Sequence, residues 1–171
     1  MTTDPSLMAL YTEVQDAFAT TEAGFGGDWP PPGTCELWFT GIADAAGQFW
    51  DSEAQDRVNC LDIRLAYEWA DPAGNLNGFD VRFQIVPNYQ KIWPSADSKP
   101  HKKAKMNIQQ FRAMAGKLLG RTVSEGDNLL SIRNDLEAIA GAETRMLVQG
   151  DVTKNGNFSN LKIVQVLSPS A

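Results

Sequence analysis

Apolar and polar residues alternate most regularly between Arg57 and Trp69. The residues on one side of this stretch are Leu61, Ile63, Leu65, Tyr67 and Trp69. A period of two predicts a β-strand with one buried face. The same period predicts strands in CELWFTGI (residues 35–42) and around residues 79–85, where Phe79, Val81, Phe83 and Ile85 point inward. We expect the intervening ADAAGQFWDSEAQD to be a loop or short hairpin, and we expect Tyr67, Trp69 and Phe83 to pack in the core.

Segments whose apolar residues repeat with the period of an α-helix come before and after these three strands. One predicted helix begins at residues 4–6, and its apolar positions are Leu7, Leu10, Tyr11, Val14 and Phe18. After a polar, proline-interrupted loop at residues 88–105, a helix runs from about Asn107 to Leu119, with Ile108, Phe111, Met114, Ala115 and Leu118 on its apolar side. NLLSIRNDLEAIAG predicts another helix. RMLVQGDV and FSNLKIVQVL predict two final strands, joined at residues 154–157 by a type I′ turn.

The order β-β-β-α-β-β predicts an α+β fold, an OB-like five-stranded barrel with an added N-terminal helix. A chain of 171 residues suits a single domain. We assign residues 1–28 to the N-terminal helix and linker, and residues 33–167 to the core. The apolar runs are too short to span a membrane, and the N-terminus lacks the basic flank of a secretory signal. We therefore expect a cytoplasmic protein with no membrane partner.

Charge is distributed unevenly along the chain. The formal net charge is -6, yet the 23 residues from Lys99 to Arg121 contain seven Lys or Arg residues and no acid. Cations gathered in this way can neutralise phosphates and release counterions. The segment therefore indicates a polyanion as ligand, and the alternative is an ordinary solvated charge run.

Aromatic residues near the basic segment favour a single-stranded ligand, because exposed rings stack on unpaired bases. Tyr89 and Trp93 precede the segment, and Trp38 alternates away from the core side of its strand. The alternative for Trp38 is burial under the N-terminal helix. Outward-facing Arg64 and Arg82 either line a groove or, for Arg82, pair with Glu68. The predicted nucleic-acid-binding residues are Trp38, Arg64, Arg82, Tyr89, Trp93, Lys99, Lys102, Lys103, Lys105, Arg112, Lys117 and Arg121.

The sequence offers little chemistry for catalysis. Its single histidine, His101, falls in the expected basic loop without an obvious Ser or Cys partner, so we expect it to be solvated or close to a phosphate. Cys35 and Cys60 lack the spacing of a metal or redox motif, and we expect both to be buried free thiols. None of the phosphate-cradling or zinc-protease motifs occurs. We therefore expect no enzyme activity, no metal and no cofactor.

Three stretches, MNIQQFRAMAGKLLG, LEAIAGAETRMLVQGDV and KNGNFSNLKIVQV, carry a resemblance to a known family. Over about residues 105–167 the chain resembles phage-encoded single-stranded-DNA-binding proteins with an OB-type core. The resemblance implies largely sequence-independent binding of single-stranded DNA in phage DNA replication or recombination, in the host cytoplasm and without catalysis. It also implies recombination or replication proteins as partners, and it leaves a homo-oligomer open. The chain ends in LSPSA rather than in the acidic tail of many such proteins.

A function of another class remains as the alternative. Residues 1–56 carry ten acids and no cation. Such a surface suits a protein-binding adaptor or inhibitor that mimics nucleic acid or docks on a basic partner.

Overall fold

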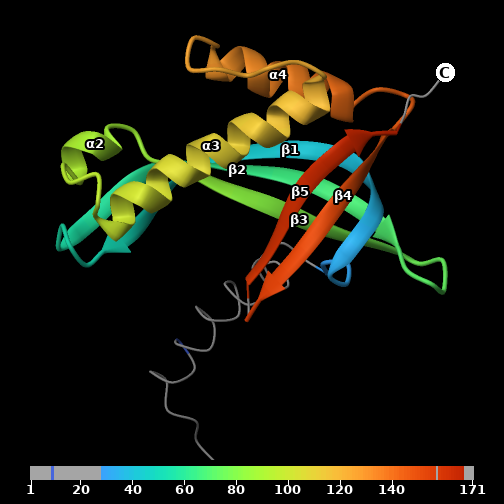
Figure 1. Ribbon diagram of the computed structural model, residues 1–171, viewed down its shortest axis with the longest axis horizontal. Helices are drawn as coiled ribbons and strands as arrows, with labels where there is room; N and C mark the ends of the chain where they lie inside the picture. Colours follow the sequence, from blue (N-terminus) through green and yellow to red (C-terminus); the bar gives the residue numbers. More distant parts are fainter. Residues whose placement is uncertain (1–8, 10–27, 157, 168–171) are drawn as a thin grey trace, which may run out of the picture.

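The computed structural model describes residue 9, residues 28–156 and residues 158–167 of the chain. Its elements are β1 (Gly33–Asp51), β2 (Asp56–Ala70), β3 (Leu76–Ile85), α2 (Tyr89–Ile92), α3 (Lys99–Leu119), α4 (Leu129–Ala140), β4 (Met146–Asn155) and β5 (Phe158–Val166) (Figure 1). The predicted α+β class with five strands is confirmed. The predicted N-terminal helix falls almost wholly outside the described residues.

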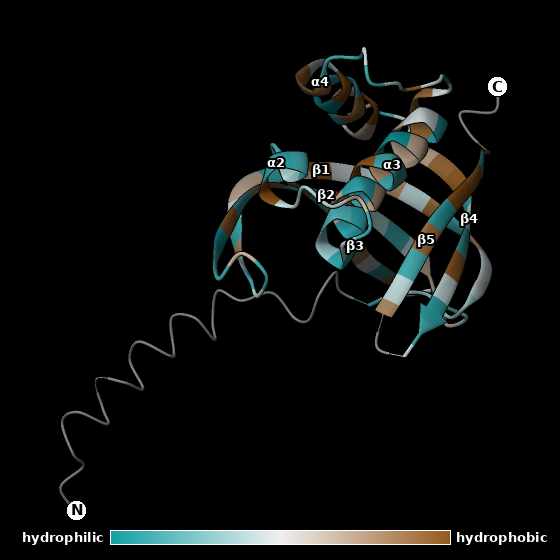
Figure 2. Ribbon diagram, turned by 60° about the vertical axis from the view of Figure 1, so that its left-hand side comes forward, coloured by the Kyte–Doolittle hydropathy of each residue, from teal (hydrophilic) through white to brown (hydrophobic). Residues whose placement is uncertain are grey.

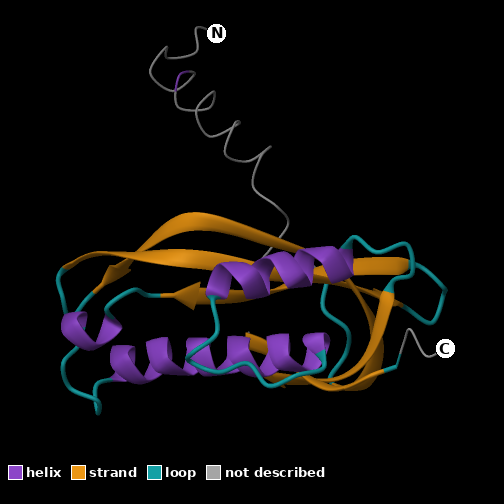
Figure 3. Cartoon of the chain, turned by 90° about the horizontal axis from the view of Figure 1, so that it is seen from above, coloured by secondary structure: helices purple, strands orange, loops and turns teal. Residues whose placement is uncertain are grey.

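The five strands form one antiparallel sheet in the order β3-β2-β1-β4-β5. β1 is the central strand: residues 33–39 pair with β4, and residues 38–51 pair with β2. The pairing of β1 with β2 shifts in register between Phe39 and Gly41, and such an irregularity bends a strand. Figure 3 shows strands curving around one end of the helices. No pairing joins β3 to β5 among the described residues, so the sheet is open between these two edges.

Helix α3 lies across this opening and contacts both β3 and β5. The Phe111 ring meets the Phe83 ring edge to face, with centroids 5.5 Å apart. Beside them, the backbone N–H of Gln84 donates to Asn107 Oδ1 over 3.4 Å. Edge strands expose unpaired backbone groups that invite association. The helix therefore covers the core and also occupies part of the free β3 edge.

The main core lies between the concave face of the sheet and helices α3 and α4. Its strand residues confirm the predicted alternation in β2 and β3, with Ile63, Leu65, Tyr67, Phe79, Val81 and Phe83 all buried. Trp69 packs partly buried against this core. Helix α4 adds Ile132 and Leu136, and its Arg133 is ion-paired with Asp44 of β1. Packing is tight at Gly150, where an added Cβ would lie 2.6 Å from Leu161 Cδ1.

A smaller satellite core holds the far end of the β1–β2 hairpin against α2 and the first turns of α3. Its buried members are Val58, Cys60, Val86, Trp93 and Ala104, with Phe49, Tyr89 and Ile92 packed around them. Through this cluster, the position of the N-terminal half of α3 depends on the hairpin.

The loop or short hairpin expected at residues 43–56 is wrong in its extent. β1 continues to Asp51, and the chain turns only at residues 52–55. The sequence pattern did not predict this part of β1, because its Ala and Gly residues have low β-propensity. Packing against the partner strand compensates for that low propensity. At Gly47, an added Cβ would lie 3.3 Å from Cys60 Sγ of β2, so β2 already fills the space that a side chain would occupy.

Candidate nucleic-acid interface

The basic residues that we expected in a loop lie on a helix. Helix α3 begins at Lys99, and the side chain of its N-cap residue, Ser98, accepts a hydrogen bond from the backbone N–H of His101 over 3.4 Å. Pro100 falls in the first turn, where a missing N–H costs nothing. The prediction treated this proline as a helix breaker, whereas a serine two residues before a proline is a helix-start signal. The predicted helix end is confirmed, because Gly120 is the C-cap at φ 68°.

Six cations and no acid lie within α3, namely Lys99, Lys102, Lys103, Lys105, Arg112 and Lys117. The five lysines are exposed and Arg112 is half-buried. In the described parts of the chain, none of the six makes a salt bridge to an acid. Like charges one helical turn apart destabilise a helix by about 0.2–0.5 kcal/mol per pair. The fold therefore gains nothing from this charge, and Figure 2 shows hydrophilic residues along the helix.

Arg121, just beyond the helix, has partners. Its guanidinium lies 3.7 Å from Asp127 Oδ1 and 3.3 Å from Asp135 Oδ2. These contacts tie the end of α3 to α4 and the segment before it. Of the predicted phosphate contacts in residues 99–121, Arg121 is the one that pairs with acids within the described part of the chain.

Trp93 is buried, so the prediction that it is exposed for base stacking is wrong. Its side chain is 3% exposed, and its ring stacks on Phe49 at a centroid distance of 6.3 Å. The indole Nε1–H donates to Asp51 Oδ2 over 2.8 Å. The physical reason is the long hairpin, which brings Asp51 and Phe49 over the indole.

His101 is buried in the same cluster, and the expectation of a solvated or phosphate-adjacent histidine is also wrong. It is 8% exposed, and its Nδ1 lies 2.8 Å from the Trp93 carbonyl oxygen. Tyr89 meets the imidazole edge to face at 4.9 Å and is itself half-buried. Tyr89 thus contributes to the satellite core, with part of its ring left accessible.

Arg64 and Arg82 face each other across β2 and β3 on the outer face of the sheet, which we define as the face turned away from the main core. Arg82 Nε donates to both carboxylate oxygens of Asp62, over 2.9 and 3.0 Å, and Arg64 Nη2 lies 3.9 Å from Asp62 Oδ2. The suggested pairing of Arg82 with Glu68 is wrong. In the register, Glu68 lies opposite Gly78, too far along the strands from Arg82, whereas Asp62 is its diagonal neighbour.

Trp38 lies on the outer face of β1, in register with Glu68 and Leu147, and is half-buried. The predicted cover over Trp38, the N-terminal helix, lies outside the described residues. Trp38 is thus a half-buried aromatic on the same face as Arg64 and Arg82.

The sequence reasoning missed two exposed aromatics at hairpin ends. Trp50 is 62% exposed and lies opposite Arg57 in the β1–β2 hairpin. Phe158 is 82% exposed at the start of β5, opposite Asn155 of β4. Trp50 was not predicted as a binding residue because it falls in residues 43–56, which were expected to form a loop or short hairpin. The signal for Phe158 was its position directly after an Asn-Gly turn, where an apolar side chain has little to pack against.

Other chemistry is sparse in this structure. In residues 28–156 and 158–167, no cluster of His, Cys, Asp and Glu could hold a metal ion. Cys35 and Cys60 are free, as expected; Cys60 is buried and Cys35 half-buried. Burial raises the pKa of both thiols, with Asp151 adding to the effect at Cys35 and Asp62 at Cys60. Both cysteines are therefore protonated at neutral pH and poor nucleophiles. No described helix is long and apolar enough to cross a membrane.

Comparison with known proteins gives no family: no protein-family model matches the chain, and no curated protein matches it significantly. The resemblance to phage single-stranded-DNA-binding proteins therefore stays an expectation.

Proposed function

We propose that this protein is an OB-like, non-enzymatic protein that binds single-stranded DNA with little dependence on sequence. The observation that carries the proposal is the row of α3 cations, none of which has an acidic partner among the described residues. In a chain of net charge -6, an unpaired basic helix attracts a polyanion to one place and repels it elsewhere. Phosphate neutralisation then supplies affinity that is independent of base identity.

Preference for a single strand is supported by the exposed aromatics. Stacking on a protein ring requires an unpaired base, and a duplex keeps its base faces covered. Trp50, at 62% exposure, has Arg57 opposite it, and Phe158, at 82%, lies opposite Asn155. The exposed Trp50 ring therefore has a cation opposite it, which is the combination that single-strand binding uses.

The OB assignment is supported by the order of the sheet. β1, β2 and β3 are joined by hairpins, and β4 returns through a long helical connection to lie beside β1, which is a Greek-key arrangement. OB domains are partly open five-stranded barrels that bind oligonucleotides on strands 2 and 3 and on the β1–β2 and β4–β5 loops. Arg64 and Arg82 lie on β2 and β3, and Trp50 and Phe158 lie near the ends of the β1–β2 and β4–β5 hairpins. A role in phage DNA replication or recombination is part of the proposal through the sequence resemblance alone.

The test is fluorescence anisotropy with labelled oligo-dT, a mixed-sequence single strand and the matching duplex, each at several salt concentrations. We expect similar binding of the two single strands, weaker binding of the duplex, and affinity that falls as salt rises. Equal affinity for the duplex would contradict single-strand binding. No binding of any oligonucleotide at low salt would overturn the proposal and favour the acidic adaptor.

A further inference from the structure

Beyond Phe39, strand β1 has an edge that no other strand covers. β4 pairs with residues 33–39, whereas β2 follows the other side of β1 as far as Asp51. In residues 28–156 and 158–167, no strand pairs with residues 40–51 on the side opposite β2. Such an edge presents a row of backbone N–H and C=O groups to any extended chain that comes beside it.

This edge is accessible from both faces of the sheet. Ala45 and Ala46 point to opposite faces of β1, and both are exposed. Helix α4 reaches the strand at Asp44, where Arg133 Nε lies 3.4 Å from Asp44 Oδ2. Sheet edges are commonly protected by lysine or proline, and residues 40–51 contain neither. The edge therefore has the properties of a site that takes up an additional strand.

The edge is anionic at both of its ends. Near its start, Asp44 and Glu137 of α4 share one guanidinium group, that of Arg133. At its end, Glu53 in the hairpin turn and Asp56 at the start of β2 are exposed. Opposite charges on neighbouring strands stabilise a sheet. This edge therefore favours an added strand that carries lysine or arginine residues.

The same charge disfavours a second copy of this chain as the added strand. Residues 33–56 carry five acids and no cation, so pairing β1 with β1 of another copy would bring acids together without a cation from either strand. Like charges on neighbouring strands are destabilising. A cationic strand from another protein meets no such repulsion.

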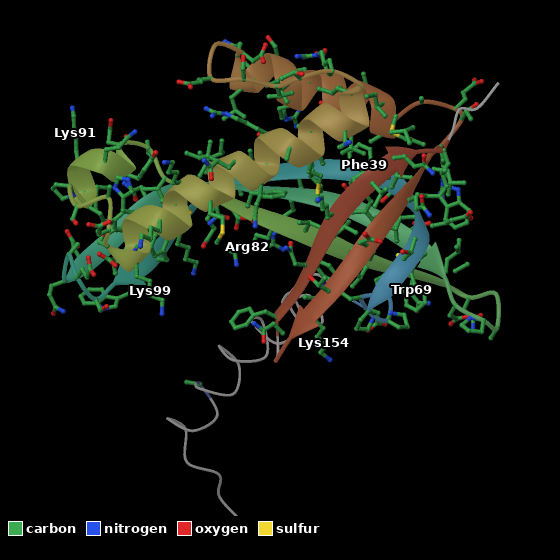
Figure 4. The ribbon with its side chains drawn as sticks, in the orientation of Figure 1. Phe39, Trp69, Arg82, Lys91, Lys99 and Lys154 are labelled. Carbon is green, nitrogen blue, oxygen red and sulfur yellow. The ribbon has the colours of Figure 1, made fainter. Side chains whose placement is uncertain are left out.

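The β1 edge is separate from the basic helix. In the strand order, β2 lies between β1 and β3, and α3 contacts β3. In Figure 4, Phe39 marks the last β1 residue beside β4, and Lys99 marks the first turn of α3. A cationic segment at the β1 edge and a nucleic acid on α3 would therefore occupy different places.

We propose that residues 43–50 of β1 bind an extended, lysine- or arginine-rich segment of a partner protein as an additional antiparallel strand. Backbone hydrogen bonds to the β1 edge supply affinity, and cations near the acids select the partner. The antiparallel direction is the more stable one per residue. This inference goes beyond the proposed binding of single-stranded DNA, does not depend on it, and assigns the protein a second kind of partner.

The test is fluorescence anisotropy of the whole protein with the labelled peptide KVTVKVTVK, whose lysines lie on one face of an extended chain. The peptide EVTVEVTVE has the same pattern with acids in place of the lysines. The peptide KVTPKVPVK keeps the lysines, but its prolines remove N–H donors from both edges of the extended chain. We expect the first peptide to bind and the other two to bind roughly tenfold more weakly.

A matched pair of variants tests whether the peptide lies on β1. Ala46 is exposed, so Ala46→Lys and Ala46→Glu should both keep the wild-type melting temperature. Ala46→Lys should weaken binding of KVTVKVTVK by roughly 1.5- to 5-fold, and Ala46→Glu should strengthen it by a similar factor. Amide hydrogen exchange gives a second readout, because the peptide should slow exchange at the outward N–H groups of residues 43–50.

Equal binding of KVTVKVTVK and KVTPKVPVK would show that charge alone is recognised, and would overturn the additional strand. Equal affinity in the two Ala46 variants, or protection of amides elsewhere, would overturn the β1 edge as the site. Failure of KVTVKVTVK to bind the wild-type protein would overturn the proposal as a whole. A wild-type dimer that Ala46→Lys converts to a monomer in sedimentation would show that the edge binds a second copy instead. Binding of oligo-dT tests the proposed function separately.

Discussion

The exposed side of α3 and the outer face of the β2–β3 pair both carry cations, but they hold them differently. On the sheet, Arg82 binds both oxygens of Asp62, and Glu68 of β2 is paired at 2.9 Å with Arg145, the residue before β4. On the helix, the lysines have no acidic partner in the described residues. Paired charges are explained by the fold that they help to hold. Unpaired charges that repel one another are explained by a ligand, and this contrast makes α3 the principal candidate for the interface.

The largest effect is expected beneath the helix, where the satellite core keeps the basic surface in place. Trp93→Ala should lower the free energy of unfolding by about 4 kcal/mol, because a buried indole is replaced by a cavity. Trp93→Phe is the control, since it keeps a ring but loses the hydrogen bond to Asp51, and it should cost clearly less. Urea unfolding measures both. If Trp93→Ala left stability intact but weakened oligo-dT binding, Trp93 would be a stacking residue after all.

Asp62→Ala tests whether the sheet charges belong to the fold. It removes a carboxylate that is 8% exposed and that accepts two hydrogen bonds from Arg82 Nε, so we expect a loss of about 2–3 kcal/mol in stability. Lys102→Ala on α3 should change stability by less than about 0.5 kcal/mol. Chemical denaturation of the two variants side by side gives the comparison. Similar losses of stability in the two variants would contradict the distinction between the paired charges of the sheet and the unpaired charges of α3.

The exposed aromatics should affect binding and leave folding unchanged. Trp50→Ala and Phe158→Ala are each expected to weaken oligo-dT binding by roughly 1–3 kcal/mol, the value of one base stack, with the melting temperature unchanged. Leu130, which is 65% exposed on α4, supplies the control, because Leu130→Ala removes an exposed apolar side chain away from both hairpin ends. An equal loss of affinity in Leu130→Ala would show that the aromatic rings have no specific role.

Local pattern predicted the parts of the fold in which packing follows the sequence period. Residues 63–67 alternate and are buried in alternation, and the apolar stripe of α3 is the side that faces the core. The second half of β1 was missed because its Ala and Gly residues carry no periodic signal. The start of α3 was missed because Pro100 was taken as a breaker rather than as a first-turn residue.

The candidate site was predicted in its charge and missed in its aromatics. A run of cations without acids can be recognised from the sequence alone, and in the structure six of these cations lie on one helix, α3. The burial of Trp93 depends on Asp51 and Phe49, more than 40 residues earlier in the chain, and no local pattern specifies that contact. The exposure of Trp50 depends on the same unpredicted hairpin. Long-range packing therefore decided which aromatic side chains are available to stack.

The most direct test of the account is the salt dependence of oligo-dT binding by a variant in which Lys99, Lys102, Lys103 and Lys105 are all alanine. We predict that the slope of log affinity against log salt flattens by at least about 1.4 units, about 0.7 for each of two or more phosphates, with the melting temperature unchanged. Binding at low salt should weaken far more than binding at high salt. An unchanged slope and affinity would show that the lysines of α3 are only a solvated surface, and would contradict the claim that this helix binds the nucleic acid.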